Sequence, residues 1–278
     1  MKGLIALDID GTITADHHAI DTSVVDYLCA LASEGWQLFF ITGRTYAWGL
    51  QLLSTLPFSF YYGSFNGALV VHFPTGEVVV RKYLHSSILA GVEALCIDGG
   101  VEFIVYTDVE GETVCYYCPH RLDAGLSAYV SMRRVKAQEK WVPLNSLSSL
   151  PVSEFPALKC FGTLESNLFV ASRIQKILPF HAPVIQDPFN TAYSVLQLTS
   201  IDVTKGTSVL QIAKHLKCKG RVIAAGDDYN DESMLAIADV AVVMATAPSP
   251  LQGIADIIAP PAFQNGIIDG LSKAIQHM

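Results

Sequence analysis

The chain has 278 residues and a net charge of −8, and 51% of its residues are hydrophobic against 16% that are charged. This length suits one large domain or two smaller ones, and the composition excludes a disordered chain. The mean hydropathy is +0.36, but apolar runs such as residues 240–245 are far shorter than the roughly 18–20 residues that a membrane span requires. Because no long basic run is present either, we expect neither a membrane nor a nucleic acid as a partner.

The N-terminal segment and the cysteines favour a cytoplasmic location. Residues 1–7 lead directly into Asp8 without the long apolar stretch of a signal peptide. The six Cys lie mostly in apolar segments, as is typical of reduced thiols. Cys115 and Cys118 form a C-x-x-C pattern, but on an extended strand this odd spacing directs the two side chains to opposite faces. We therefore expect no metal or redox role for this pair.

The first third of the chain alternates between strand and helix patterns. A short apolar strand over residues 4–9 is followed by a helix that begins after Asp21 and runs to residue 31. A second strand at residues 37–41 precedes a helix at residues 45–56. This repetition of strand, loop and helix predicts a parallel α/β sheet.

The middle of the chain has a different pattern, rich in hairpins. The sequence predicts two hairpins, at residues 68–73 with 77–81 and 101–107 with 113–118. It also predicts three helices, at residues 86–97, 121–130 and 165–178, and two further strands, at residues 158–164 and 192–198. The strand and helix alternation then resumes, at residues 204–216, 221–225, 230–237, 240–244, 256–259 and 266–275. We predict a Rossmann-like, doubly wound α/β core formed by residues 1–81 and 200–278, with an α+β domain inserted at residues 82–199.

The first chemical motif is Asp8-Ile9-Asp10-Gly11-Thr12, at the end of the first predicted strand. Ligands bind at the carboxyl ends of strands in open α/β sheets, and Asp8 and Asp10 would point to the same side of an extended chain. Two neighbouring carboxylates repel each other unless a cation or a proton lies between them, and their oxygens suit Mg²⁺. The alternative is an ordinary Asp-Gly turn in which Asp8 only caps.

Two further clusters could bind a phosphate group. Thr42-Gly43-Arg44 follows the second predicted strand and offers a hydroxyl and backbone N–H groups at a helix start, although an ordinary Thr cap would look the same. Lys205 lies in the first turn of a predicted helix, where a positive charge is unfavourable unless an anion pairs with it. A solvated Lys at a frayed helix end is the alternative.

The last cluster, Gly226-Asp227-Asp228-Tyr229-Asn230-Asp231, follows the strand predicted at residues 221–225. Its carboxylates and its amide can ligate a hard cation and cap the next helix. The alternative is an acidic first turn that only complements the helix dipole.

Taken in order, these four clusters resemble the motifs of the haloacid dehalogenase superfamily, and in particular its Cof-type branch, subfamily IIB. Asn66-Gly67-Ala68 and Met234-Leu235 also fit that branch. The resemblance covers essentially the whole chain and implies a phosphatase whose inserted domain is a C2-type cap that closes over the active site. Two departures concern loops: Met244-Ala245-Thr246-Ala247 replaces a common Gly-Asn-Ala, and Gln264-Asn265 replaces an acidic residue.

The resemblance also implies roles for individual residues. Asp8 would be the nucleophile that forms an aspartyl-phosphate, and Asp10 the acid/base. The catalytic and substrate-binding residues would be Asp8, Asp10, Thr42, Gly43, Arg44, Asn66 and Lys205. Mg²⁺ would be held by Asp8, the Asp10 carbonyl and Asp227, supported by Asn230 or Asp231. The substrate would be a small phosphorylated metabolite, such as a sugar phosphate.

Two other functions are compatible with the same motifs. A phosphomannomutase-like phosphotransferase would need a second phosphate site, for which residues 133–136 are the only dense basic cluster in the insertion, although we expect them to form a solvated helix face. A non-catalytic binding protein with this fold would usually have lost Asp8 or Asp10, and both are present.

Overall fold

The computed structural model describes residues 1–16, 18–109, 112–136, 139–177, 180–187 and 190–276. These residues form two compact units. The first unit comprises Met1–Arg44, Gly49–Val80 and Thr204–Met278, and the second comprises Thr45–Trp48 and Arg81–Val203. The insertion expected at residues 82–199 lies within the second unit, and its role as a cap stays a proposal.

The first unit contains an eight-stranded sheet with the order β17-β16-β15-β1-β2-β3-β4-β5. Its strands are β1 (Gly3–Leu7), β2 (Trp36–Ile41), β3 (Phe60–Ser64), β4 (Leu69–Phe73), β5 (Glu77–Arg81), β15 (Arg221–Gly226), β16 (Val240–Met244) and β17 (Ile257–Ala259). Its helices are α1 (Thr22–Ser33), α6 (Lys205–His215), α7 (Glu232–Leu235), α8 (Ser249–Gln252) and α9 (Gly266–Gln276), together with most of α2 (Tyr46–Leu53).

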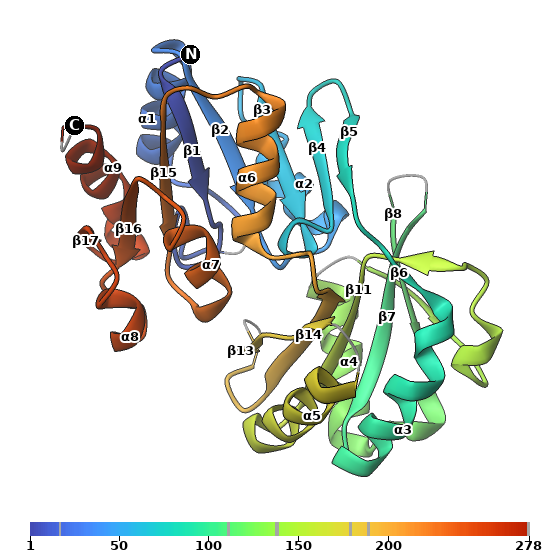
Figure 1. Ribbon diagram of the computed structural model, residues 1–278. Coiled ribbons are helices and arrows are strands. Elements are labelled where there is room, and N and C mark those ends of the chain that lie inside the picture. The colour runs from blue at the N-terminus through green and yellow to red at the C-terminus, as the bar shows by residue number, and fades with distance from the viewer. Residues whose placement is uncertain (17, 110–111, 137–138, 178–179, 188–189, 277–278) are drawn as a thin grey trace. The chain divides into compact units, whose positions relative to one another are not determined.

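Helices cover both faces of this sheet, so its central strands are apolar on both sides. All five residues of β1 are buried, and so are all five residues of β16. Helices α6 and α7 pack together on one face, and α1 and α9 pack together on the other. Figure 1 shows α6 and α7 in front of the sheet and α1 behind it. The doubly wound α/β core is therefore confirmed.

The sheet is parallel from β17 to β3 and becomes antiparallel at β4. Strand β3 is not predicted from the sequence, because its residues Phe60–Ser64 form a short apolar run with no helix after it. Only four residues, 65–68, connect β3 to β4, which is too short for the crossover that parallel strands need. The hairpin expected at residues 68–81 therefore extends the core sheet at one edge.

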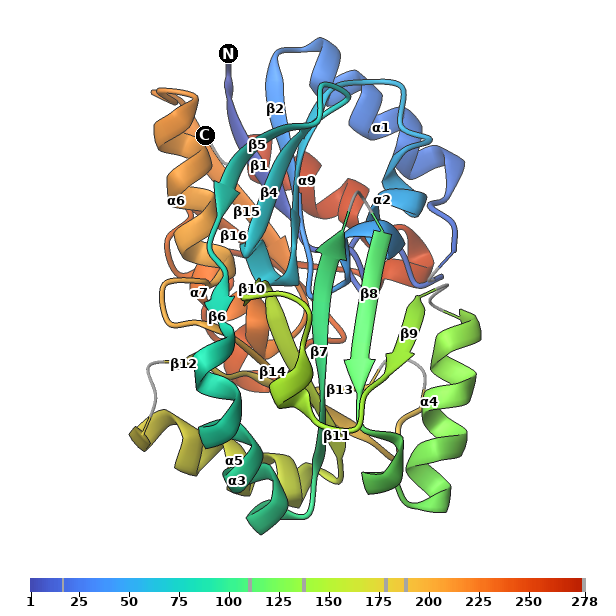
Figure 2. The ribbon, with the colours of Figure 1, turned by 90° about the vertical axis from the view of Figure 1, so that its right-hand side faces the viewer.

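The second unit contains a seven-stranded sheet with the order β12-β14-β11-β7-β8-β9, in which β13 also pairs with β14. Its strands are β7 (Glu102–Val109), β8 (Glu112–Tyr117), β9 (Lys140–Pro143), β11 (Ala157–Gly162), β12 (Phe180–His181), β13 (Val184–Gln186) and β14 (Ser194–Ser200), and β6 (Leu84–His85) pairs with β10 (Glu154–Phe155). Its helices are α3 (Leu89–Gly99), α4 (Ala124–Lys136) and α5 (Leu164–Ile177). Figure 2 shows β7, β8 and β9 side by side, with α3 and α5 away from α4.

The helices of the second unit differ in detail from those expected. The helix predicted from residue 86 begins as a 3-10 turn, Ser86–Ile88, before α3, and α4 starts at Ala124 rather than at residue 121. Residues 110–111, in a predicted turn, and residue 178, at a predicted helix end, lie outside the described residues. Cys118 packs against the cluster beneath α3 and α5, while Cys115 lies beside Glu139 and Lys159, and both are free thiols.

The expectation of a solvated helix face at residues 133–136 is wrong for Arg133, whose side chain is only 2% exposed. Its guanidinium lies 3.4 Å from Asp187 and 4.0 Å from Glu139, and it stacks over the ring of Phe161. Arg134, in contrast, is exposed. Arg133 faces the sheet because successive helical residues point in directions about 100° apart, so neighbours in the sequence cannot share one face.

No helix among the described residues is long and apolar enough to cross a membrane.

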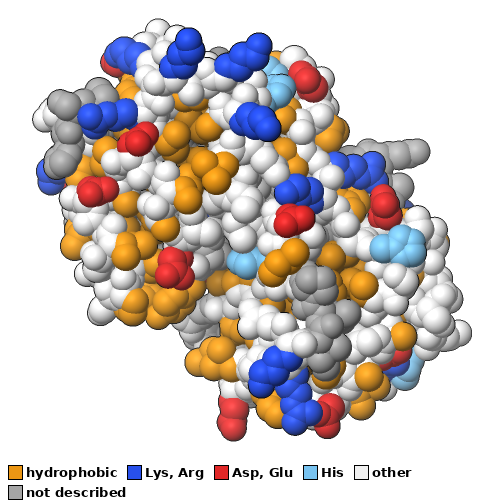
Figure 3. Space-filling view, viewed as in Figure 1, with side chains coloured by type: hydrophobic (Ala, Val, Ile, Leu, Met, Phe, Trp, Pro, Cys, Tyr) orange, Lys and Arg blue, Asp and Glu red, His pale blue; other side chains and the backbone are white. Residues whose placement is uncertain are grey.

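On the face shown in Figure 3, Lys and Arg side chains gather along the upper edge of the first unit, over the C-terminal end of α6. Exposed Lys214 and Lys217 lie in this part of the chain. Positive charge there complements the negative end of the helix dipole, which accounts for it without a partner.

Glycine is required at the second residue of α6. A Cβ on Gly206 would lie 2.2 Å from the backbone oxygen of Ser233, at the start of α7, and backbone cannot yield cheaply. We expect Gly206→Ala to lower the free energy of unfolding by about 2 kcal/mol or more. The matched control is Gly125→Ala, also at the second residue of a helix, where the nearest atoms lie 3.4 Å away. It should be neutral or should stabilise by up to about 1 kcal/mol. Urea denaturation of both variants measures the difference, and equal effects would contradict the close approach.

Candidate active site

Three loops of the first unit meet at the carboxyl edge of its sheet. Asp8 directly follows β1, Thr42 follows β2, and Asp227 follows β15, and these three strands are neighbours in the sheet. The backbone pairing of β1 with β15 continues past the end of β1, where the Asp8 N–H donates a hydrogen bond to the Ala225 carbonyl at 3.0 Å. The parallel topology therefore brings together motifs that lie as far as 219 positions apart in the sequence (Asp8 to Asp227).

A buried ion-pair triad lies at the centre of this edge. The Lys205 ammonium donates to Asp8 Oδ1 and to Asp231 Oδ1, each at 2.5 Å. The side chains of Lys205 and Asp231 have no exposed surface, and that of Asp8 is 7% exposed. Thr204 caps α6 and fixes the helix start that carries the lysine. The lysine at the helix start is therefore paired with anions, and the solvated alternative is excluded.

The other oxygen of Asp231 organises the loop that follows β15. Asp231 Oδ2 accepts hydrogen bonds from the backbone N–H groups of Asp227, at 2.9 Å, and Asp228, at 3.0 Å. Both carboxylate oxygens of Asp231 are thus engaged within the protein. In place of the helix expected at residues 230–237, the loop forms a 3-10 turn, Tyr229–Asp231, followed by the short helix α7.

Asp227 approaches the first motif closely, and Gly11 makes this possible. Gly11 has a φ of +80°, and a Cβ there would lie 2.1 Å from the Asp227 carboxylate. The Thr12 hydroxyl donates to Asp227 Oδ1 at 3.2 Å. One carboxylate oxygen each from Asp8, Asp227 and Asp231 lies within 4.8 Å of the others. Three hard oxygen donors this close form a group that can hold a divalent cation.

The electrostatics of the three carboxylates show an excess of negative charge. Burial raises the pKa of Asp8, Lys205 lowers it, and Asp231 and Asp10 raise it again, which leaves it at about 7. Burial, together with the charges of Asp8 and Asp231, raises the pKa of Asp227 well above its ordinary value. Burial lowers the pKa of Lys205, but Asp231 and Asp8 raise it beyond its usual range. One ammonium does not neutralise three carboxylates, so a bound cation would be favourable here.

The expected substrate-binding residues form the adjoining wall. Thr42 is 2% exposed, and its carbonyl accepts from the Asn66 backbone N–H at 2.8 Å. Phe65 and Asn66 both have positive φ values, 50° and 57°, a strained conformation that is common at functional sites. Asn230 Nδ2 donates to Asn66 Oδ1 at 3.2 Å, a link that the sequence analysis did not anticipate.

Arg44 is buried in this wall and pairs with Asp10. Its Nε donates to Asp10 Oδ2 at 2.8 Å and its Nη2 donates to Asp10 Oδ1 at 2.6 Å. Arg44 is expected from the sequence to bind the substrate, and its pairing with Asp10 is not predicted, because nothing in their spacing signals a contact across 34 residues.

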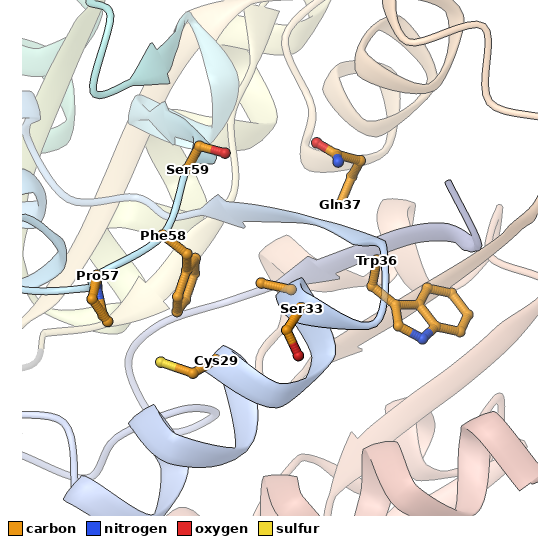
Figure 4. A pocket seen from close by; sticks show the side chains of 8 residues that line it. Cys29, Ser33, Trp36, Gln37, Pro57, Phe58 and Ser59 are labelled. Atoms are coloured by element: carbon orange, nitrogen blue, oxygen red, sulfur yellow. The ribbon is translucent and has the colours of Figure 1, made fainter.

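A separate hollow of about 370 Å³ lies at the other end of β2, where the strand begins. Figure 4 shows its lining, which includes Cys29, Ser33, Trp36, Gln37, Phe58 and Ser59. Its lining contains no Asp, Glu, Lys, Arg or His, so it lacks the carboxylates and the lysine of the edge described above. The charged residue types that the predicted chemistry needs therefore lie at the carboxyl edge and not in this hollow.

Comparison with known proteins identifies the family. Residues 5–271 match the family model described as haloacid dehalogenase-like hydrolase. The chain belongs to this family. The match spans all four clusters, from Asp8 to Asp231.

Relatives and solved structures agree with the assignment to the haloacid dehalogenase-like hydrolases. Phosphatase YwpJ of Bacillus subtilis (strain 168) is 24% identical over 277 residues, which cover 95% of this chain and 96% of the relative. HMP-PP phosphatase of Serratia proteamaculans (strain 568) is 24% identical over 91% of this chain and 88% of its own length. The family and the names of these relatives identify the protein as a phosphatase.

The solved structures confirm the fold. A haloacid dehalogenase-like hydrolase from Bacteroides thetaiotaomicron superposes with a TM-score of 0.77 at 20% identity, covering 99% of this chain and 100% of that one. The subclass IIB sugar phosphatase BT4131 superposes with a TM-score of 0.73 at 23% identity, covering 99% and 98%. Both comparisons span the two units of the chain.

The triad generates a test that does not depend on turnover. Lys205→Met leaves two buried carboxylates without their ammonium, and we expect it to lower the free energy of unfolding by about 3–5 kcal/mol near pH 8. In the wild type the pKa of Asp8 is about 7 with Lys205 lowering it, so without this ammonium the carboxyl stays protonated up to a higher pH. The deficit should therefore shrink as the pH falls from roughly 8 to 7, where only the variant gains a proton on folding, and then change little down to pH 5.

Urea denaturation of Lys205→Met at these pH values measures this change. The matched control is Lys214→Met, an exposed lysine on the same helix, which should unfold like the wild type. A deficit in Lys205→Met that does not vary with pH would contradict the electrostatic explanation.

Proposed function

We propose that the protein is a Mg²⁺-dependent phosphatase that hydrolyses a small phosphomonoester through an aspartyl-phosphate on Asp8. The observation that carries the proposal is the buried triad of Lys205 with Asp8 and Asp231, next to the carboxylate of Asp227. A nucleophile needs to be held in place and kept ionised, and the ammonium at 2.5 Å supports both requirements.

The reaction we propose has two steps. In the first, an Asp8 carboxylate oxygen attacks the phosphorus, the bond from phosphorus to the substrate oxygen breaks, and Asp10 gives a proton to that oxygen. In the second, a water attacks the phosphorus of the aspartyl-phosphate, Asp10 takes the water's proton, and the bond from phosphorus to Asp8 breaks. The aspartyl-phosphate intermediate divides a very slow hydrolysis into two easier displacements.

The surrounding residues would bind the phosphoryl group. We assign Thr42, Gly43, Asn66 and Lys205 to its oxygens, because hydroxyl, backbone N–H, amide and ammonium groups donate hydrogen bonds to developing negative charge. The buried positions of Thr42 and Asn66 support this assignment, since donors that are already oriented lose little entropy when they bind.

The donor set fits Mg²⁺. Asp8, the Asp10 backbone carbonyl and Asp227 would hold the ion, with Asn230 and Asp231 in support. Bound Mg²⁺ would offset negative charge on the phosphoryl oxygens. Since Asp231 already binds Lys205 and two backbone N–H groups, we propose that it acts by fixing the loop of Asp227.

The substrate we propose is a sugar phosphate or a similar small metabolite, encountered in the cytoplasm. This class is suggested by the sugar phosphatase among the structural neighbours. We assign the choice between such substrates to the second unit, the candidate C2-type cap. A phosphomannomutase-like reaction is less well supported, because the guanidinium of Arg133 is already paired with Asp187 and Glu139.

Asp8→Asn should abolish phosphatase activity and leave the fold intact. The amide keeps the shape of the side chain but is a poor nucleophile and a weaker metal ligand, so we expect kcat to fall by at least about a thousandfold. Steady-state assays on a panel of sugar phosphates, with circular dichroism as the folding check, measure this. Asp26→Asn, at an exposed position on α1, is the control and should keep wild-type activity. A folded Asp8→Asn protein above that residual rate would refute the covalent mechanism.

Activity should depend on a hard divalent cation of the right size. After dialysis against EDTA we expect no turnover, recovery with Mg²⁺, and no recovery with Ca²⁺, which prefers more ligands and longer bonds. Mg²⁺ should also raise the melting temperature of the wild type more than that of Asp227→Asn, because binding to the folded state stabilises it. Full activity in EDTA would count against the metal assignment.

A further inference from the structure

The pairing of Arg44 with Asp10 has a geometry that suits orientation. Two adjacent nitrogens of one guanidinium, Nε and Nη2, each bind a different oxygen of the same carboxylate, at 2.8 and 2.6 Å. Such a fork restricts both the position and the plane of the carboxylate, which a single point charge cannot do. The Asp10 carboxylate is therefore held in one orientation.

Arg44 is itself held rigidly, so it can act as a fixed support. Its side chain is 1% exposed, whereas that of Asp10 is 28% exposed. The Arg44 backbone N–H donates to the Thr42 hydroxyl at 3.1 Å, and its carbonyl accepts from the Phe65 N–H at 3.0 Å. The Arg44 side chain thus extends from the wall of the site to one side of the Asp10 carboxylate, and that carboxylate remains partly exposed.

The burial of the Arg44 guanidinium has to be compensated by favourable contacts. Removing a charge from water costs several kcal/mol, and the cost is offset only by well-placed partners. An arginine kept for a substrate phosphate would present its fork to the site, but here the Nε and Nη2 edge of the fork is directed at Asp10. A carboxylate oxygen can accept more than one hydrogen bond, so pairing with Arg44 does not by itself prevent Asp10 from taking a proton.

We propose that Arg44 is a positioning residue that holds the Asp10 carboxylate ready to take a proton from the attacking water, and that it is not a ligand of the substrate. The inference rests on the proposed function, in which Asp10 is the acid/base. It concerns the second step: water oxygen bonds to phosphorus, its proton moves to Asp10, and Asp8 leaves as a carboxylate. A misdirected Asp10 would slow this step and let the aspartyl-phosphate accumulate.

The test is a pre-steady-state assay of Arg44→Lys with p-nitrophenyl phosphate and Mg²⁺. The p-nitrophenolate leaving group needs no proton, so the first step does not depend on Asp10. We expect a burst of about one p-nitrophenolate per enzyme, a steady-state rate at least about tenfold below the wild type, and a burst rate close to the wild-type first step. Intact-mass spectrometry after acid quenching should show most of the variant phosphorylated.

Three comparisons separate orientation from a structural effect. Asp10→Asn should give the same burst, and Arg221→Met, an exposed arginine of the first unit, should behave like the wild type. Added guanidinium, but not ammonium, should speed the second step of Arg44→Ala by restoring the missing fork. Should Arg44→Lys fold poorly, the rescue of Arg44→Ala still decides the question.

The outcomes are distinguishable. Wild-type turnover with no burst in the Arg44 variants, and a raised KM for phosphate esters, would assign Arg44 to the substrate and overturn the inference alone. A wild-type protein that hydrolysed no phosphomonoester in the presence of Mg²⁺ would overturn the proposed function and the inference together.

Discussion

The buried contact of Lys205 with Asp8 and Asp231 is the interaction on which the rest of the site depends. It joins the end of β1, the start of α6 and the loop after β15 through a single ammonium group. A lysine with no exposed surface is tolerated only because two carboxylates lie within hydrogen-bonding distance. Asp231 in turn orders the backbone of Asp227 and Asp228, so the ammonium of Lys205 organises both acidic motifs.

Backbone conformation lets these charged groups approach one another. Gly11, at a φ of +80°, has no Cβ to strike Asp227, and Gly206 lets α6 lie against the start of α7. Phe65 and Asn66 are held in the left-handed region, with hydrogen bonds to Arg44 and Thr42 on either side. Strain at these positions is balanced by the ordered neighbours, a common cost of a preorganised site.

The second unit also buries charge, although by different means. Arg133, a residue of α4, lies between Asp187 and Glu139, with the aromatic ring of Phe161 against it. Burial lowers the pKa of Lys159 to about 7, with the charge of Arg133 as a further cause. The sequence around Arg133 looks like a surface cluster, because three of its four residues are charged and only the position of the sheet reveals which one is covered.

The sequence by itself determined the alternation of strands and helices in the core, the order of the four motifs and the family. These features are local or ordered along the chain, so periodicity, caps and spacing are enough to find them. Only the tertiary structure decided that the sheet becomes antiparallel between β3 and β4, that Arg133 is buried, and that Arg44 pairs with Asp10. Each of these depends on contacts between residues distant in sequence. Such contacts are set by how the sheet and helices pack, and no local pattern of residue types encodes them.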